Sequence, residues 1–354
     1  MRGRARLLVL PLLLVALTTF GLNGVVVATS ADDENQLKVG RSIDIFSRFG
    51  YLSLSMKVVP RNDTDWIFRE PTIDIFDDMG RYLIQPARSP RKQRRVFDGD
   101  FHMEFCDNLK QLVQAYFRDF SFELLEQPWK AFTSSWSAET LARNLGVTSG
   151  FVTKDFCYVL VRLSRFWDSA KLGRSPRSVN VVDIVKEEID GIKVGDAASV
   201  LLFMKKYGSH YIQSYVTGNS LYQVFVFNKT RYHQIKDRLK NQGISHISES
   251  ELNQYFSPWQ AEHVGLIKTA SGNKTVEEWA SSKLRQSYFI FTYSTLLKSK
   301  GDSRLLTRLN NLLRNEAILG MDMKSLGVVI EDQNKKLWFD EVLDNVLKLW
   351  ESNL

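Results

Sequence analysis

The stretch Tyr207-Gly208-Ser209-His210-Tyr211, followed six residues later by Gly218, decides the fold of this chain. It lies where a helical pattern, capped by Asp196, gives way to a strand pattern at 221–227. Gly208 suits the left-handed position that ends a helix. Gly218 and the following Asn219 are expected to turn the chain sharply into the strand, because both residue types tolerate positive φ.

The same stretch resembles the signature of the membrane attack complex/perforin (MACPF) superfamily: aromatic, Gly, Ser or Thr, His, aromatic, six residues and Gly-Gly. The only departure is Asn219, which stands where the second glycine usually lies. The resemblance implies an α+β fold in which a bent central antiparallel sheet is flanked by two helical clusters. In pore-forming members those clusters unfurl into membrane-spanning hairpins.

Residue patterns along the chain agree with this class. An alternating pattern of apolar residues against serines and a lysine predicts a half-buried strand at 50–59, and patterns rich in aromatic and β-branched residues predict strands at 151–166, 221–227 and 288–293. Amphipathic helical patterns occupy 107–149 and 229–285 between them, and strands spaced by helical segments indicate an α+β domain. Two more amphipathic helices are expected, from Ser303 to Gly320 and from Lys335 to Trp350. The last one can dock on the domain, or it can bind a membrane or a partner.

The N-terminal residues indicate export. A basic start and a short apolar run predict a signal peptide over 1–30, with cleavage before Ala31 and with Gly21 or Gly24 as alternative sites. A signal anchor that continues to Val27 is the other interpretation. The expected division is therefore a MACPF domain at 31–300 and a helical extension at 301–354 that packs on it.

The formal net charge of +7 is modest for 354 residues. It argues against nucleic acid as the main partner and allows contact with anionic lipid or sulfated glycan.

Cysteines and sequons fit an exported chain. The two cysteines, Cys106 and Cys157, are expected to form a disulfide in an oxidising compartment, with two buried free thiols as the alternative. Three N-glycosylation sequons begin at Asn62, Asn228 and Asn273. The predicted product is a secreted glycoprotein, retained at the cell surface or in an eggshell matrix.

A basic cluster lies in a stretch broken by proline and contains Arg88, Arg91, Lys92, Arg94 and Arg95. Three interpretations stay open. It can bind heparan-type glycan or anionic lipid. The run from Lys92 to Arg95 loosely resembles a proprotein-convertase site. It can also be a solvated loop or an edge strand protected by its charge.

Catalytic patterns are absent from the sequence. The five histidines have no paired metal-ligand spacing, and there is no nucleophile turn, phosphate loop or dinucleotide-binding glycine motif. We therefore expect no enzyme activity, no metal and no cofactor. His210 is interpreted as a partly buried residue that fixes the junction through hydrogen bonds.

Two functions compete. A chain without appended modules resembles the secreted signalling members of the superfamily, which implies spatially restricted activation of the Torso receptor tyrosine kinase. Components of that receptor pathway, including the receptor's ligands, are then the expected partners. The alternative is a membrane-inserting pore former of the perforin type. Charges at Lys236, Asp237, Arg238 and Lys240 count against it, because a lipid-facing Lys or Arg costs roughly 2–4 kcal/mol at the bilayer midplane.

Overall fold

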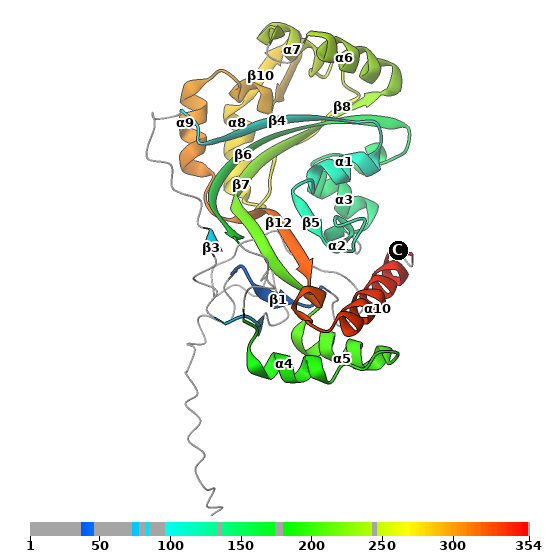
Figure 1. Cartoon of the computed structure of the whole chain (residues 1–354). Helices are drawn as coiled ribbons and strands as arrows, with labels where there is room; N and C mark the ends of the chain where they lie inside the picture. The colour runs from blue at the N-terminus through cyan, green and yellow to red at the C-terminus, as the bar shows by residue number, and fades with distance from the viewer. Residues whose placement is uncertain are drawn as a thin grey trace, which may run out of the picture.

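A curled sheet runs through the protein and helices cover both of its faces (Figure 1). The computed structural model describes residues 37–45, 73–77, 83–84, 96–133, 136–173, 180–242 and 246–352. Four predictions lie outside the described residues: the signal peptide 1–30, the strand 50–59, the sequon at Asn62 and the basic cluster 88–95.

Two long antiparallel strands, β6 (Phe156–Leu172) and β7 (His210–Asn228), form the centre of the sheet. β4 (Gly99–Cys106) pairs with the outer side of β6, and β12 (Ala317–Ser325) pairs with the first half of β7. β5 (Phe120–Phe122) runs parallel to β12, so the sheet is mixed and not wholly antiparallel. The other described strands of this sheet are β1 (Arg41–Ile43), β2 (Ile73–Asp74), β3 (Leu83–Ile84), β8 (His263–Val264) and β9 (Lys268–Thr269).

Alternating side chains of the sheet build two hydrophobic cores. Tyr158 and Val224 belong to one core, and their neighbours Val159 and Phe225 belong to the other. The first core is covered by α1 (Leu109–Tyr116), α2 (Lys130–Thr133), α3 (Ala138–Leu145), α4 (Asp183–Asp190), α5 (Ala197–Tyr207) and α10 (Gln333–Ser352). The second is covered by α6 (Lys229–Gln242), α7 (Glu249–Tyr255), α8 (Lys274–Lys283) and α9 (Ser303–Leu312). The predicted α+β class, a bent sheet flanked by two helical clusters, is confirmed.

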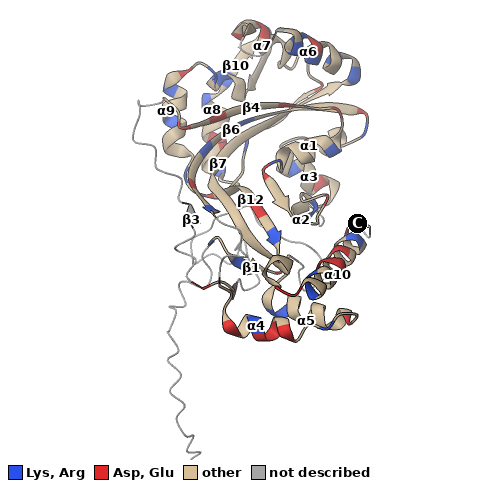
Figure 2. Ribbon diagram, viewed as in Figure 1, with Lys and Arg blue, Asp and Glu red and all other residues tan. Residues whose placement is uncertain are grey.

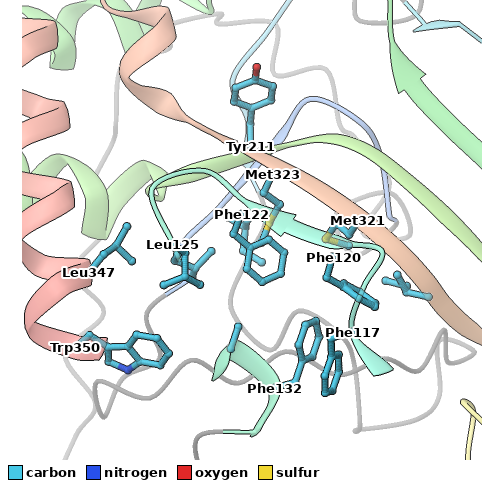
Figure 3. Packing of buried hydrophobic residues seen from close by; sticks show 14 of the residues in the cluster. Phe117, Phe120, Phe122, Leu125, Phe132, Tyr211, Met321, Met323, Leu347 and Trp350 are labelled. Carbon is cyan, nitrogen blue, oxygen red and sulfur yellow. The ribbon is translucent and has the colours of Figure 1, made fainter. Parts of the chain in front are cut away.

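Aromatic packing dominates the first core beside β5 (Figure 3). Phe117 stacks on Phe132 with ring centroids 4.7 Å apart, and Phe120 meets Phe132 edge-on at 4.7 Å. Such pairs add about 0.5–1.5 kcal/mol each beyond the burial of their area. The aromatic-rich pattern of 107–149 is thus explained by ordinary packing against the sheet. In the second core, the predicted stripe Tyr232, Ile235 and Leu239 on α6 is fully buried.

The C-terminal part of the chain corrects two predictions. α9 starts after an Asp302 cap and ends at Leu312, and the residues that follow form β12 inside the sheet. A helix from Ser303 to Gly320 is therefore wrong, and a domain boundary at 300 would cut through the sheet. The leucines of this segment have helical spacing, but residues 317–325 pair with β7 and therefore form a strand. α10 packs Phe339, Leu343 and Leu347 into the first core.

Strand predictions also needed correction at their ends. The segment 288–293 is not a strand but the tip of a hairpin between β10 (Arg285–Tyr288) and β11 (Phe291–Ser294). The strand expected at 151–166 begins only at Phe156, after the short 3-10 helix η2 (Ser149–Phe151), and continues to Leu172. The strand expected at 221–227 is the second half of β7, which already starts at His210. Two further 3-10 helices are η5 (Leu296–Ser299) and η6 (Leu326–Val329).

Candidate functional site

Gly208 carries the chain from α5 into β7. Its φ of 88° lies in the region that L side chains rarely adopt. A Cβ here would lie 2.6 Å from the carbonyl carbon of Ile43 in β1. The next residue binds that strand directly, because the Ser209 N–H donates to the Ile43 oxygen at 3.0 Å. The glycine therefore permits both the change of direction and the close approach of β1.

His210 is fully buried and makes a hydrogen bond through each ring nitrogen. Nε2 lies 2.8 Å from the backbone oxygen of Glu123, which can only accept, so Nε2 carries the hydrogen. Nδ1 then accepts from Ser209 Oγ at 2.9 Å. Burial lowers the pKa of His210 to about 4, because the desolvated site disfavours the imidazolium. The ring is therefore neutral at physiological pH, and it is more deeply buried than the sequence predicts.

Four segments meet at this junction. His210 of β7 pairs with Ile43 of β1 on one side and with Ser325 of β12 on the other. The Glu123 carboxylate, just after β5, accepts from the Ser325 N–H at 2.8 Å. Ser209 and His210 resemble a nucleophile–base pair in their spacing, but both side chains have no exposed surface. Their contacts hold strands together and offer nothing to a substrate.

Gly218 is not at a turn, so that prediction is wrong. It lies inside β7, opposite Phe166 of β6 and Ala317 of β12, and neither Gly218 nor Asn219 has positive φ. A close approach explains the glycine instead. A Cβ would lie 2.1 Å from the backbone oxygen of Arg165.

The sheet bends beside this glycine. β6 shifts register between Phe166 and Asp168, and β12 shifts register between Ile318 and Gly320. Irregularities of this kind increase local twist and bend the bulged strand. Both neighbours of β7 thus shift register at the level of Gly218, which adds to the curl of the sheet visible in Figure 1.

Asn219 is the centre of a polar cluster and not a substitute for a left-handed glycine. Its Nδ2 donates to Ser271 Oγ and to Glu316 Oε2, both at 2.9 Å. Ser271 Oγ also donates to Glu316 at 3.1 Å, and the Asn273 amide donates to both Glu316 oxygens at 3.2 Å. A second glycine at 219 could make neither of the two Nδ2 bonds. The cluster joins β7 to the start of α8 and to the entry of β12.

Two of the predicted glycosylation acceptors lie among the described residues, and their surroundings differ. Asn228 is exposed at the start of α6, where its Nδ2 donates to Glu262 at 2.7 Å. Asn273 is half-buried: its Oδ1 caps α8 by accepting from the Val276 N–H, while its Nδ2 is held by Glu316. A glycan would replace a hydrogen on that nitrogen. Glycosylation itself stays a prediction at both positions.

The predicted disulfide is absent, since Cys106 and Cys157 are both free and buried. Cys106 lies opposite Tyr158 in the β4–β6 ladder, and both belong to the first core. Cys157 precedes Tyr158, so its side chain points to the other face and belongs to the second core. The sheet therefore separates the two sulfurs. Burial raises the pKa of the Cys106 thiol to about 12.

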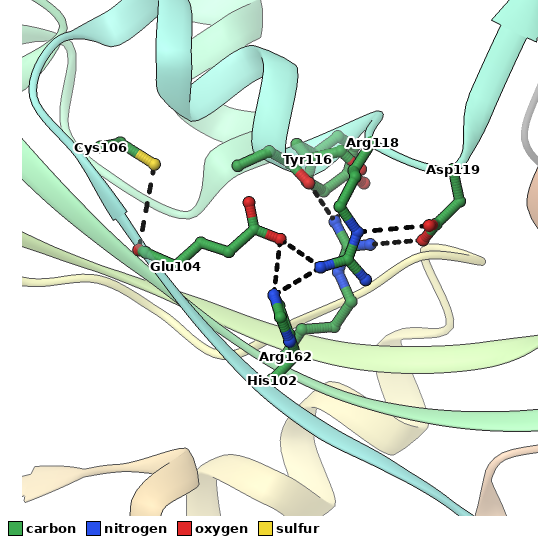
Figure 4. A network of polar contacts seen from close by, with 8 residues as sticks. His102, Glu104, Cys106, Tyr116, Arg118, Asp119 and Arg162 are labelled. Atoms are coloured by element: carbon green, nitrogen blue, oxygen red, sulfur yellow. Dashed lines mark hydrogen bonds and ion pairs between the residues drawn. The ribbon is translucent and has the colours of Figure 1, made fainter. Parts of the chain in front are cut away.

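An arginine cluster that the sequence did not reveal holds α1 to the sheet (Figure 4). Arg162 of β6 donates to the backbone oxygens of Ala115 and Tyr116 at 3.2 and 2.6 Å, which caps the C-terminus of α1. Beside it, Arg118 pairs with Glu104 of β4 at 2.6 Å and with Asp119 at 3.2 Å. His102 joins Glu104 at 2.8 Å and also contacts Arg118.

A second clamp holds α6. The Asp107 carboxylate, which follows β4, accepts from the Tyr232 hydroxyl at 2.7 Å and from Lys236 Nζ at 2.6 Å. The lysine contact, followed by the tyrosine contact, lowers the pKa of Asp107. Each helical cluster is thus tied to the sheet by charged contacts as well as by its apolar face.

No group of His, Cys, Asp and Glu in the described ranges has the proximity needed for a metal ion. No helix among them is both long and apolar enough to cross a membrane.

By sequence, no family model matches the chain and no curated protein matches it. Solved structures are similar in fold. GNIP1Aa from Chromobacterium piscinae aligns with 88% of this chain at 12% identity and a TM-score of 0.43. A Bacteroides thetaiotaomicron protein with a MAC/Perforin domain aligns with 88% at 10% identity and a TM-score of 0.40. The chain spans 55% and 59% of those two proteins.

A third similar structure is Astrotactin-2, a perforin-like vertebrate membrane protein involved in neuronal development. It aligns with 87% of this chain and over 96% of its own solved chain, at 13% identity and a TM-score of 0.34. These similarities concern the path of the chain.

Proposed function

We propose that the chain is a secreted, non-enzymatic signalling protein of the MACPF type, similar in role to the insect protein Torso-like. In this role it enables activation of the Torso receptor tyrosine kinase where it is deposited, in terminal patterning and developmental growth. Its partners would be the ligands and other components of that receptor pathway, and it would be retained at a cell surface or in extracellular matrix. The support comes from the signature junction and from the character of α6.

The composition of α6 is the observation that favours signalling over pore formation. A segment that inserts as a β-hairpin needs about 9–11 residues per strand, with one alternating face apolar. Every second residue from Lys229 to Leu239 reads Lys, Arg, His, Ile, Asp, Leu. The other set, from Thr230 to Lys240, reads Thr, Tyr, Gln, Lys, Arg, Lys. Neither set could face lipid, and Figure 2 shows basic residues along this helix.

α8 gives the same result. One alternating set, from Lys274 to Ser282, reads Lys, Val, Glu, Ala, Ser, and the other, from Thr275 to Lys283, reads Thr, Glu, Trp, Ser, Lys. Releasing the second cluster would also break the Asp107 clamp on α6 and the Arg238–Glu251 pair between α6 and α7. The helices are thus suited to remain folded on the sheet.

A paired experiment tests this proposal. Purified chain is added to dye-loaded liposomes and, separately, to reporter cells that express Torso and receive its ligand. We expect no dye release at nanomolar protein and a reporter signal that depends on the chain. Dye release together with Torso activation in the absence of the chain would reverse the conclusion and support the perforin-type alternative.

A further inference from the structure

The hairpin formed by β10 and β11 places large apolar side chains in solvent. Its two-residue turn consists of Phe289 and Ile290, which are 79% and 88% exposed. Trp259, in the loop after α7, is 64% exposed and lies beside them, with ring centroids 6.3 Å from Phe289. Tyr288 completes the group, since its ring lies 4.6 Å from that of Phe289. We call Trp259, Tyr288, Phe289 and Ile290 the hairpin tip.

The backbone of the tip is also strained. Phe289 has a φ of 52°, whereas a bulky side chain at positive φ is a rare outlier. Where a two-residue hairpin turn has positive φ only at its first residue, that residue is normally glycine. A phenyl ring is therefore held where glycine would fit best, and a conformation of this cost commonly marks a functional position.

Hydrogen bonds hold the base of the hairpin to the rest of the fold. Gln223, buried in β7, donates from Nε2 to the backbone oxygen of Ser294 at 2.9 Å. Lys298 Nζ donates to the backbone oxygens of Lys283 and Arg285 at 3.3 and 2.6 Å. The Tyr293 hydroxyl, at the limit of hydrogen bonding, lies 3.5 Å from the oxygen of Asn253 in α7. The fold thus presents the tip on a fixed support.

Three basic side chains lie at this base. Lys283 and Arg285 are exposed, and Lys298 is half-buried between them. Glu277 and Glu278 of α8 line the groove beside Arg285, but Glu277 is already paired with Lys268 at 2.6 Å. The hairpin carries apolar residues at its tip, Trp and Tyr beside them, and Lys and Arg at its base. This order matches the layers of an anionic bilayer, which are the acyl chains, the headgroup level and the charged surface.

We propose that the hairpin tip is a peripheral membrane anchor. Phe289 and Ile290 enter the boundary of the acyl chains of an anionic bilayer, Trp259 and Tyr288 lie at headgroup depth, and Lys283 and Arg285 meet the lipid charge. A protein partner fits less well, because a stable protein interface buries about 800 Å² on each side, far more than a convex turn of two residues presents. The anchor is independent of the signalling role, since it requires neither Torso nor its ligands.

Vesicle binding tests the anchor. Full-length protein is sedimented with sucrose-loaded vesicles of phosphatidylcholine alone or with 30% phosphatidylserine (about a third anionic lipid, enough for a strong surface potential). We expect binding to the mixed vesicles that weakens as salt rises. Phe289→Gly should weaken that binding by about tenfold or more, since it removes a phenyl ring from the apolar phase. The same change should leave thermal stability equal or higher, because glycine relieves the turn.

Matched variants separate the anchor from general stickiness. Leu202→Ser removes another exposed apolar side chain, 68% exposed on α5 at the other end of the molecule, and should leave vesicle binding unchanged. Ile290→Asn should weaken binding as Phe289→Gly does. Absence of binding by the wild-type protein would overturn the anchor, as would equal loss in Leu202→Ser. Tip variants that lose reporter activity while the wild type ignores vesicles would assign the tip to a protein partner instead.

Discussion

Replacing Gly218 by alanine should test the origin of the bend in the sheet. The new Cβ would lie 2.1 Å from the Arg165 oxygen, whereas carbon–oxygen contacts between strands begin at about 3.3 Å. β6 and β7 would have to separate by roughly 1 Å, which stretches neighbouring ladder hydrogen bonds beyond their useful range. Two weakened hydrogen bonds cost about 1 kcal/mol each, and overpacking strain adds about 1–3 kcal/mol. Alanine usually stabilises a strand slightly relative to glycine, so the net loss in unfolding free energy is about 3 kcal/mol.

Chemical denaturation followed by circular dichroism measures this loss, and the thermal unfolding midpoint should fall by roughly 4–5 °C for a domain of this size. Gly150→Ala is the matched control, because nothing lies within 4 Å of its Cβ and its φ is not positive. That variant should differ from wild type by less than about 1 kcal/mol. If Gly218→Ala is as stable as Gly150→Ala, the close approach to Arg165 does not explain the glycine.

Three further predictions concern polar groups inside the fold. His210 has a pKa of about 4 in the folded protein and about 6.5 in the unfolded chain. Its contribution to the free energy of unfolding is therefore complete above pH 6.5, and about 3 kcal/mol of it is lost as the pH falls to 4. The unfolding free energy of His210→Gln should lack this dependence on pH, and an unchanged dependence would contradict the assignment. Cys106 and Cys157 should both be found as free thiols by non-reducing peptide mapping, with alkylation only after unfolding; a linked peptide pair would refute this. Asn273→Ala should cost about 1–2 kcal/mol even in unglycosylated protein, because the cap of α8 and the bond to Glu316 are lost; wild-type stability would refute it.

The sequence alone predicted the elements whose signals are local. α5 begins after Asp196 and ends at Gly208 as its cap and stop residues indicate. The buried stripe on α6 followed from helical spacing. The long β6 and β7 were recognisable by residue type, although their ends were not. Local signals sufficed here because caps and periodicity act within one or two turns of chain.

The candidate site was predicted only in part. The signature pointed to the residues of this junction, but the reasons offered for two of them were wrong. Gly218 is required by the oxygen of Arg165 on another strand, and Asn219 is required by Glu316, which follows it by almost a hundred residues. Nothing near either residue in the chain signals those neighbours.

The sequence by itself thus determined the class of the fold, the junction between α5 and β7, and the polarity that argues against membrane insertion of α6. Only the tertiary structure decided the pairing of β12 with β7, the separation of Cys106 and Cys157 by the sheet, and the exposure of Phe289 at a hairpin tip. The physical reason is the range of the interactions. Helix caps and amphipathic stripes act between neighbours in the chain, whereas strand register and burial depend on segments that meet only in the folded molecule.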